Sequence, residues 1–141
     1  MVVTDAYAEG RVPAELASAA YVLEIARVLK QDGVALWNLA DEPGLRYVAK
    51  VLATVRQSLP HVALIATHEV LKGKRFGNSV VVAGAAPLPM ETLRRDVARA
   101  NLPTGLREGV ALERVVASAK PFGDKGMQSP PPPETGRWRA R

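Results

Sequence analysis

The stretch HVALIATHEVLKGKRFGNSVVVAGA (residues 61–85) contains two apolar runs, 61–67 and 78–85, separated by a ten-residue connection. Short apolar runs rich in valine and isoleucine are typical of strands that are buried on both faces. The connection 68–77 is basic and contains two glycines. We therefore predict two consecutive strands that pair as an antiparallel hairpin.

Upstream of this hairpin, predicted strands and helices alternate. Residues 2–4 read as the end of a buried strand, and a helix of about sixteen residues follows from Pro13, because proline at the first helical position has its φ preset. Residues 34–40 form a second apolar run. A second helix opens at 41–43 and ends before Pro60. Its apolar residues recur at helical spacing: Leu45, Val48, Ala49, Leu52, Val55 and Leu59.

This order predicts an α/β fold with a parallel sheet, right-handed crossovers, helices on the faces of the sheet and a final hairpin. Two further helices are expected over 90–101 and 109–119. From residue 121 the chain is rich in proline, glycine and charge, which predicts a flexible or polyproline-type tail. The expected organisation is an α/β unit over 1–86, a helical extension over 87–120 and a tail over 121–141.

Composition excludes several classes of protein. The chain has 141 residues, of which 48% are apolar and none is cysteine, so disulfides and thiolate metal sites are excluded and a reducing cytoplasm is expected. We find no apolar run of transmembrane length and no signal peptide. The net charge is +5, but the basic residues are scattered and aromatics make up only 5%. A solvated basic surface is therefore favoured over nucleic-acid binding.

Polar side chains at the carboxyl ends of the predicted strands are the candidates for a ligand site, because open parallel sheets bind ligands there. Asp5 and Asn38 occupy such positions. Each has a structural alternative, since Asp5 could accept hydrogen bonds in a turn and Asn38 could cap one. The chain lacks a glycine-rich turn between a strand and a helix, and Gly73 and Gly77 lie between two strands, where they make a poor phosphate loop.

Three segments together resemble a known family: VVTDAYAEGRVPAEL (2–16), LKQDGVALWNLAD (29–41) and PHVALIATHEVLKGKRFGNSVVVAG (60–84). They are similar to the second half of spermidine synthase-like proteins, closest to the actinobacterial branch, over residues 1 to about 120. The resemblance implies the Rossmann-like fold of S-adenosylmethionine-dependent methyltransferases, whose last two strands form an antiparallel hairpin. It also implies decarboxylated S-adenosylmethionine or S-adenosylmethionine as cofactor, no metal, an amine substrate and a dimer.

The resemblance assigns roles to individual residues. Asp5 matches the first acid of the family's Asp-x-x-Asp-Pro motif and would accept a proton from the amine that displaces methylthioadenosine. The second acid is replaced by Ala8, which leaves putrescine in doubt as the substrate. Asn38 stands near the place of a glutamine that contacts the amine, Tyr7 would line the amine channel, and Pro13 would lie near the adenosyl group. Glu9 stands where the motif has its proline.

Other readings remain open. The same fold would suit methyl transfer, and a non-catalytic module is a third possibility, because an uncovered sheet edge would pair with another copy or another chain. His61 and His68 lack a partner acid at ligand spacing and are expected to be surface or turn residues. A solvated loop is favoured over a dimer contact for Lys72, Lys74 and Arg75. From the residues alone, Tyr7 is more simply a packing aromatic, and Trp37 is expected in the core.

Overall fold

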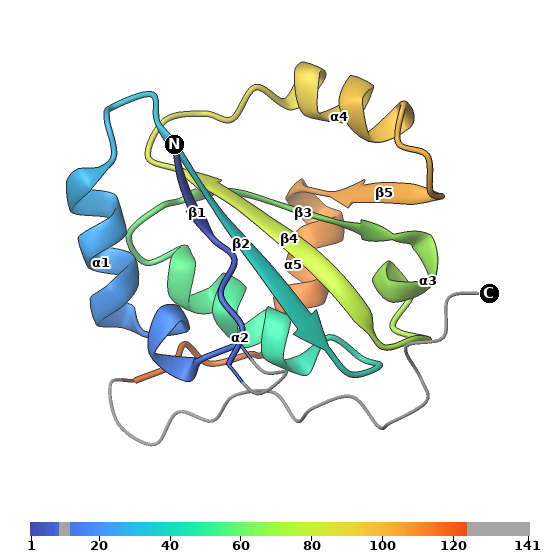
Figure 1. Cartoon of the computed structure of the whole chain (residues 1–141), viewed down its shortest axis with the longest axis horizontal. Helices are drawn as coiled ribbons and strands as arrows, with labels where there is room; N and C mark the ends of the chain where they lie inside the picture. Colours follow the sequence, from blue (N-terminus) through green and yellow to red (C-terminus); the bar gives the residue numbers. More distant parts are fainter. Residues whose placement is uncertain (9–11, 124–141) are drawn as a thin grey trace.

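Five strands form one sheet in the computed structural model, which describes residues 1–8 and 12–123 (Figure 1). The strands are β1 (Val2–Thr4), β2 (Val34–Asp41), β3 (His61–Thr67), β4 (Gly77–Gly84) and β5 (Thr104–Arg107). Their order across the sheet is β1-β2-β4-β3-β5. β1 and β2 are parallel, whereas β4 is antiparallel to both of its neighbours and β5 is antiparallel to β3.

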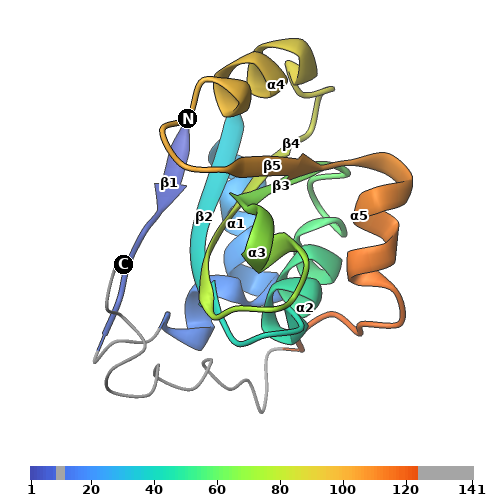
Figure 2. The same ribbon diagram turned by 90° about the vertical axis from the view of Figure 1, so that its right-hand side faces the viewer.

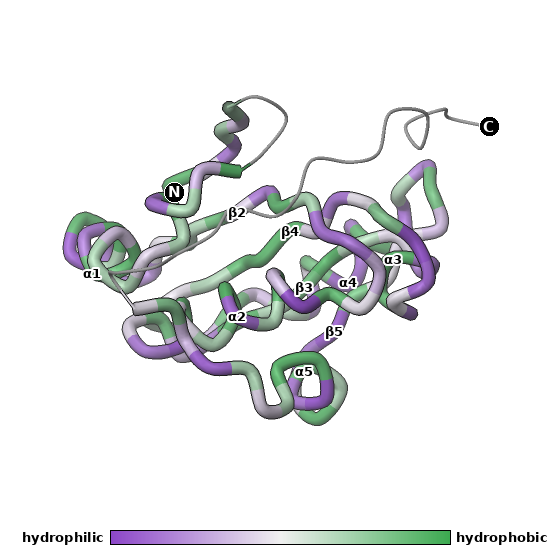
Figure 3. The backbone as a smooth tube through the Cα atoms, turned by 90° about the horizontal axis from the view of Figure 1, so that it is seen from below, coloured by the Kyte–Doolittle hydropathy of each residue, from purple (hydrophilic) through white to green (hydrophobic). Residues whose placement is uncertain are grey.

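The predicted hairpin of β3 and β4 is confirmed by this pairing. The finding that the sequence did not predict is the position of β4, which inserts between β2 and β3. β2 and β3 therefore run in the same direction without touching. β4 suits a central position because Ser79 and residues 81–84 are all buried, and most of the strand has the hydrophobic colour in Figure 3.

The helical elements are η1, a 3₁₀ turn (Ala14–Ala17), and α1 (Ala19–Val28), α2 (Arg46–Val55), α3 (His68–Leu71), α4 (Met90–Ala98) and α5 (Gly109–Val116). The long helix predicted from Pro13 is thus two elements. Ser18 separates them with an extended backbone, and its Oγ accepts a hydrogen bond from the Tyr21 backbone N–H at 3.0 Å. Serine in this position is a preferred N-cap, so it begins a new helix instead of continuing the old one.

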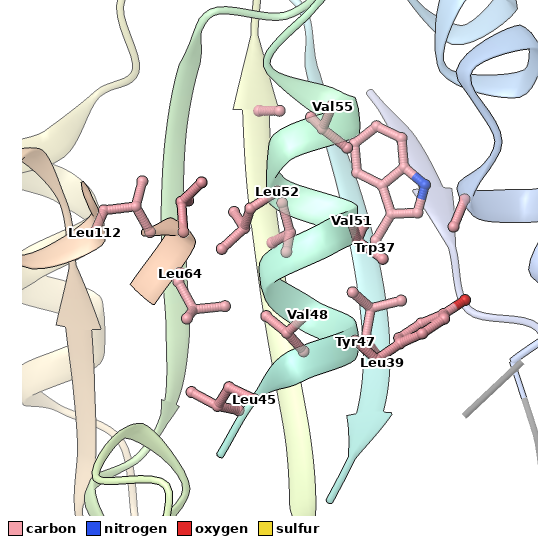
Figure 4. Packing of buried hydrophobic residues seen from close by; sticks show 14 of the residues in the cluster. Trp37, Leu39, Leu45, Tyr47, Val48, Val51, Leu52, Val55, Leu64 and Leu112 are labelled. Carbon is pink, nitrogen blue, oxygen red and sulfur yellow. The ribbon is translucent and has the colours of Figure 1, made fainter. Parts of the chain in front are cut away.

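The main core lies between α2 and one face of the sheet (Figure 4). Trp37 is fully buried there, as predicted, and its Nε1 donates to the Leu16 carbonyl at 3.0 Å. All six apolar residues of the predicted α2 stripe are buried. The helix itself begins only at Arg46, because Gly44 and Leu45 have φ values of 99° and 53°, which are incompatible with a right-handed helix.

The opposite face of the sheet carries a smaller cluster, in which Met90 and Leu93 of α4 pack near Val82 and Ala63. In Figure 2, α4 lies at the end of the sheet away from α2. Within the predicted helical extension, the two helices are present as α4 and α5, but β5 lies between them and pairs with β3. A four-residue strand containing one glycine gives only a weak sequence signal.

The last described residues pack against α2. The Phe122 backbone N–H donates to Thr54 Oγ1 at 2.8 Å, and the Phe122 ring lies 5.4 Å from that of Tyr47. The rest of the predicted proline-rich tail, residues 124–141, lies outside the described residues.

Candidate functional site

Asp5 lies directly after β1, beside Asn38 of β2. Asn38 is in the middle of β2, which continues to Asp41, so the prediction that it stands at the carboxyl end of its strand is wrong. The parallel register pairs Thr4 with Trp37. The residues that follow them, Asp5 and Asn38, are therefore also neighbours. Asn38 Nδ2 donates a hydrogen bond to Asp5 Oδ1 at 2.9 Å. The two predicted site residues are therefore in direct contact, although they are thirty-three positions apart in the chain.

Asn78 on β4 extends this contact to a third strand. Its Nδ2 donates to Asn38 Oδ1 at 3.3 Å. Because the Asn38 amide donates on one side and accepts on the other, its orientation is defined by both neighbours. We call Asp5, Asn38 and Asn78 the polar row. The sequence analysis missed Asn78, since only the insertion of β4 beside β2 reveals that it lies near Asn38.

The polar row lies on the face of the sheet away from α2. Side chains alternate along β2, and Trp37 and Leu39 point into the main core, so Asn38 points to the other face. Asp5 and Asn78 are exposed and Asn38 is half-buried. The row is therefore open to solvent and accessible to a ligand.

Tyr7 lies close enough to Asp5 for the negative charge of the carboxylate to affect the pKa of its phenol. Its side chain is 40% exposed. Partial burial raises the pKa of the Tyr7 phenol, and the negative charge of Asp5 raises it further. The phenol is thus protonated at neutral pH and available to donate a hydrogen bond at this end of the sheet.

Two other predicted positions are less well connected to the row. Pro13 is half-buried at the start of η1, where its carbonyl accepts from the Leu16 N–H at 3.1 Å. Glu9 and the remainder of 9–11, which join Pro13 to the β1 end, lie outside the described residues. Ala8 is exposed, and its methyl group supplies no charge where the resembling family has its second acid.

Asp41 is a second carboxylate at the same end of the sheet, and its environment is different. It is 3% exposed and accepts hydrogen bonds from the backbone N–H groups of Glu42 at 2.8 Å and Val48 at 2.9 Å. Burial raises the pKa of the Asp41 carboxyl despite these donors. Asp41 therefore holds the first turn of α2 and is not available to a ligand.

The basic connection between β3 and β4 is solvated. Lys72, Lys74 and Arg75 are exposed, and Lys72 forms an exposed ion pair with Glu69 at 3.2 Å. The hydrogen bond from Lys72 lowers the pKa of the Glu69 carboxyl. Such a pair contributes little to stability, and the solvated interpretation of this loop is the simpler one.

The histidines do not join the polar row. His61 begins β3 and His68 begins α3, so they lie at opposite ends of one strand. Across residues 1–8 and 12–123, no three His, Asp or Glu side chains converge as metal ligands would. Within the same part of the chain, no helix has the length and apolar character needed to cross a bilayer.

A cavity of about 280 Å³ lies at the opposite end of the sheet, at the start of β3. Its wall includes His61, Leu88 and Met90. The charged groups Arg56 and Glu113 in this wall bind each other at 2.7 Å. Since the amino end of β3 is remote from the carboxyl end of β1, this cavity is separate from the polar row.

Comparisons with known proteins support the fold. A solved structure described as a probable spermidine synthase from Corynebacterium glutamicum ATCC 13032 superposes with a TM-score of 0.78 and 21% sequence identity. The match covers 89% of this chain and 47% of that chain, so this chain spans less than half of its neighbour's length. No family model and no curated protein matches the sequence. The chain therefore has a spermidine synthase-like α/β fold, and the predicted fold class is confirmed.

Proposed function

We propose that this chain supplies the amine-binding side of a spermidine synthase-like aminopropyl transferase, with Asp5 as the general base. The observation that carries the proposal is the exposed 2.9 Å contact between Asn38 and Asp5 on the face of the sheet away from α2. The fold of the structural neighbour supports it, since that protein is described as a probable spermidine synthase.

The polar row has the chemistry that an amine needs. An amine presents N–H donors, and the Asp5 carboxylate accepts them and then accepts a proton when the nitrogen becomes a nucleophile. Asn38 donates to Oδ1 of Asp5, which leaves Oδ2 for the substrate. Tyr7, protonated and nearby, is proposed as a further substrate contact.

The substrate is proposed to be an amine that makes a single ionic contact at this end. Ala8 provides no second carboxylate, and Asp41 is committed to the backbone of α2. A diamine held by two acids is therefore a poor fit. A monoamine, or a polyamine whose other nitrogens lie in solvent, suits one exposed carboxylate better.

The fit to the cofactor is incomplete. An S-adenosyl group needs a cradle for its ribose and base, and the sequence has no glycine-rich turn between a strand and a helix. The polar row offers one carboxylate and two amides, which fit the amine and not the adenosyl group. The proposal therefore concerns amine binding and proton acceptance by this chain. Pro13 is proposed to border S-adenosylmethionine or its decarboxylated form.

Calorimetry tests the proposal with putrescine, spermidine and a monoamine, alone and together with methylthioadenosine. We expect amine binding that Asp5→Asn weakens by about tenfold or more, because a charge-assisted contact is lost. Where transfer from decarboxylated S-adenosylmethionine is measurable, the same variant should slow it by about 10²-fold or more. Asp96→Asn is the matched control, since Asp96 is an exposed carboxylate on α4.

Absence of heat with every amine at millimolar concentration would overturn the proposal, as would equal binding by the wild type and Asp5→Asn. Methyl transfer from S-adenosylmethionine, without aminopropyl transfer, would keep the role of Asp5 and change the reaction.

A further inference from the structure

Asn78 is the member of the polar row that lies farthest from Asp5. β2 separates β1 from β4 in the strand order, so the backbones at Asp5 and Asn78 are two strand spacings apart, or about 10 Å. Two short side chains do not form a direct hydrogen bond over this distance. Any effect of Asn78 on Asp5 therefore has to pass through Asn38, which lies between them.

The register of β2 and β4 places Asn78 where it can reach Asn38. Asn38 pairs directly with Val80, and Asn78 pairs directly with Ala40. Asn78 is therefore the diagonal cross-strand neighbour of Asn38, on the same face of the sheet. The hydrogen bond from Asn78 Nδ2 to Asn38 Oδ1, at 3.3 Å, follows this diagonal.

The two hydrogen bonds of the polar row run in one direction, towards Asp5. Asn78 donates to Asn38, and Asn38 donates to Asp5. An ionised carboxylate only accepts hydrogen bonds, and an amide accepts through its oxygen and donates through its nitrogen. The orientation that gives Nδ2 of Asn38 to Asp5 therefore gives its Oδ1 to Asn78. The reverse orientation would place this oxygen against the carboxylate and the nitrogen against the Asn78 donor.

We propose that Asn78 is a positioning residue for Asp5 and acts through Asn38. By binding Oδ1 of Asn38, it stabilises the amide orientation in which Nδ2 holds Oδ1 of Asp5 and leaves Oδ2 for an amine. Donation to the Asn38 oxygen also polarises that amide, which strengthens its own N–H donation. Asn78 itself does not touch the amine.

The supporting strands explain why Asp5 needs this help. β1 has three residues and Asp5 follows it directly, so the backbone ladder of β1 gives the carboxylate little support. β2 and β4 pair along all eight residues of each strand. The polar row therefore links Asp5, at the end of a short strand, to side chains on the two longest strands of the described sheet. Groups held by such rigid elements keep a site's geometry more precisely than groups held by a strand end alone.

The orientation of Asn38 by Asn78 stands without any ligand, whereas its consequence for amine binding rests on the proposed function. The two parts are therefore measured separately. The first measurement uses the full chain without an amine, and the second uses the amines that test the proposed function.

The carboxyl carbon resonance of Asp5 in isotope-labelled protein reports on the row without an amine. Asn78→Leu removes the amide donor and changes no charge, so we expect a shift at Asp5 that is relayed by Asn38. The same substitution in an Asn38→Ala background should give no shift, because the relay is absent. Gln57→Leu is the matched control, since Gln57 is an exposed amide just after α2, at the other end of the sheet, and should leave the resonance in place. An Asp5 resonance that does not respond to Asn78→Leu, or that responds equally without Asn38, would overturn the proposal.

Calorimetry with the same variants measures the consequence for amine binding. Asn78→Leu and Asn78→Ala should each weaken it by about three- to tenfold, as expected for one lost hydrogen bond. In the Asn38→Ala background, either substitution should change it by less than about twofold. Because Asn78 is exposed, all variants should keep the wild-type melting temperature. Equal losses with and without Asn38 would show that Asn78 contacts the amine itself and would contradict a positioning role. If the wild type binds no amine, the proposed function fails, and the Asp5 resonance still decides whether Asn78 positions Asp5.

Discussion

Asp5 and Asp41 occupy equivalent places in the sequence pattern and have opposite environments in the structure. Each follows or ends an apolar strand, and each precedes a helical segment. Asp5 is exposed and binds the side chain of Asn38. Asp41 is 3% exposed and binds the backbone at the start of α2.

This difference shows that a carboxylate at a strand end has a structural role when the backbone N–H groups at the start of the next helix need a hydrogen-bond acceptor. The first N–H groups of a helix have no partner within the helix, and Asp41 serves the Val48 N–H. At the end of β1, η1 and α1 begin well beyond Asp5, and Ser18 caps α1. Asp5 is therefore left with a side-chain partner and an accessible oxygen.

The largest expected effect is on stability, and it separates the two acids. Asp41→Ala removes the acceptor of two backbone donors, so we expect a loss of about 2–3 kcal/mol in the free energy of unfolding. Asp5→Ala should change it by no more than about 0.5 kcal/mol, as is usual for an exposed position. Urea unfolding of both variants measures the difference. Equal losses would show that Asp5 is as structural as Asp41.

The sequence predicted this comparison only in part. Apolar runs and helical periodicity located four of the five strands and the α2 stripe, because burial patterns are local in sequence. The sequence pattern predicts Asp5 and Asn38 as site residues. It does not predict their contact, because that contact depends on the register of two strands. Asn78 could not be found because the place of β4 is set by tertiary packing, which no local pattern encodes.

The role of Asp41 illustrates the same limit. The sequence showed an acid before a helix, which suggested only where the helix opens. Its environment depends on how the chain returns from β2 into α2, because that return brings the Val48 backbone N–H to the Asp41 carboxylate. Residues 44 and 45 are left-handed at that return, and no local sequence pattern predicts a φ of 53° at Leu45.

Two tyrosines extend the comparison with a smaller expected effect. The Tyr47 hydroxyl, near Asp41, is buried without a hydrogen-bond partner in the part of the chain that the structure describes, whereas the Tyr21 hydroxyl is 3.0 Å from Thr4 Oγ1. Tyr47→Phe should therefore stabilise the protein by up to about 1 kcal/mol. Tyr21→Phe should destabilise it by about 1 kcal/mol. Thermal and urea unfolding measure both, and a loss on Tyr47→Phe would reveal a partner for its hydroxyl.

Tyr47 also predicts behaviour at alkaline pH. Burial, with the charges of Asp41 and Glu15, raises the pKa of the Tyr47 phenol to about 12. The unfolded chain ionises this group near pH 10 and the folded chain does not, so the stability that it contributes is lost as the pH rises from about 10 towards 12. Tyr47→Phe should flatten the stability profile in this range. An unchanged slope relative to the wild type would contradict the assignment.

The smallest expected effect is the acid-range pH dependence of Asp41. Its folded pKa is raised, chiefly by burial, so the protonated form stabilises the fold below the unfolded pKa and this contribution is lost as the pH rises through the folded value. The difference in unfolding free energy between the wild type and Asp41→Asn should therefore shrink from about pH 4 to pH 7.

Glu69→Gln is a control of opposite sign for that measurement. Lys72 lowers the pKa of Glu69, so the contribution of this exposed carboxylate is present above the unfolded pKa and is lost as the pH falls. Urea unfolding across the same pH range should give opposite slopes for the two variants. If the Asp41→Asn difference grows with pH, the backbone donors of Glu42 and Val48 outweigh the cost of burial. Asp41 would then be a charged cap at the positive end of α2.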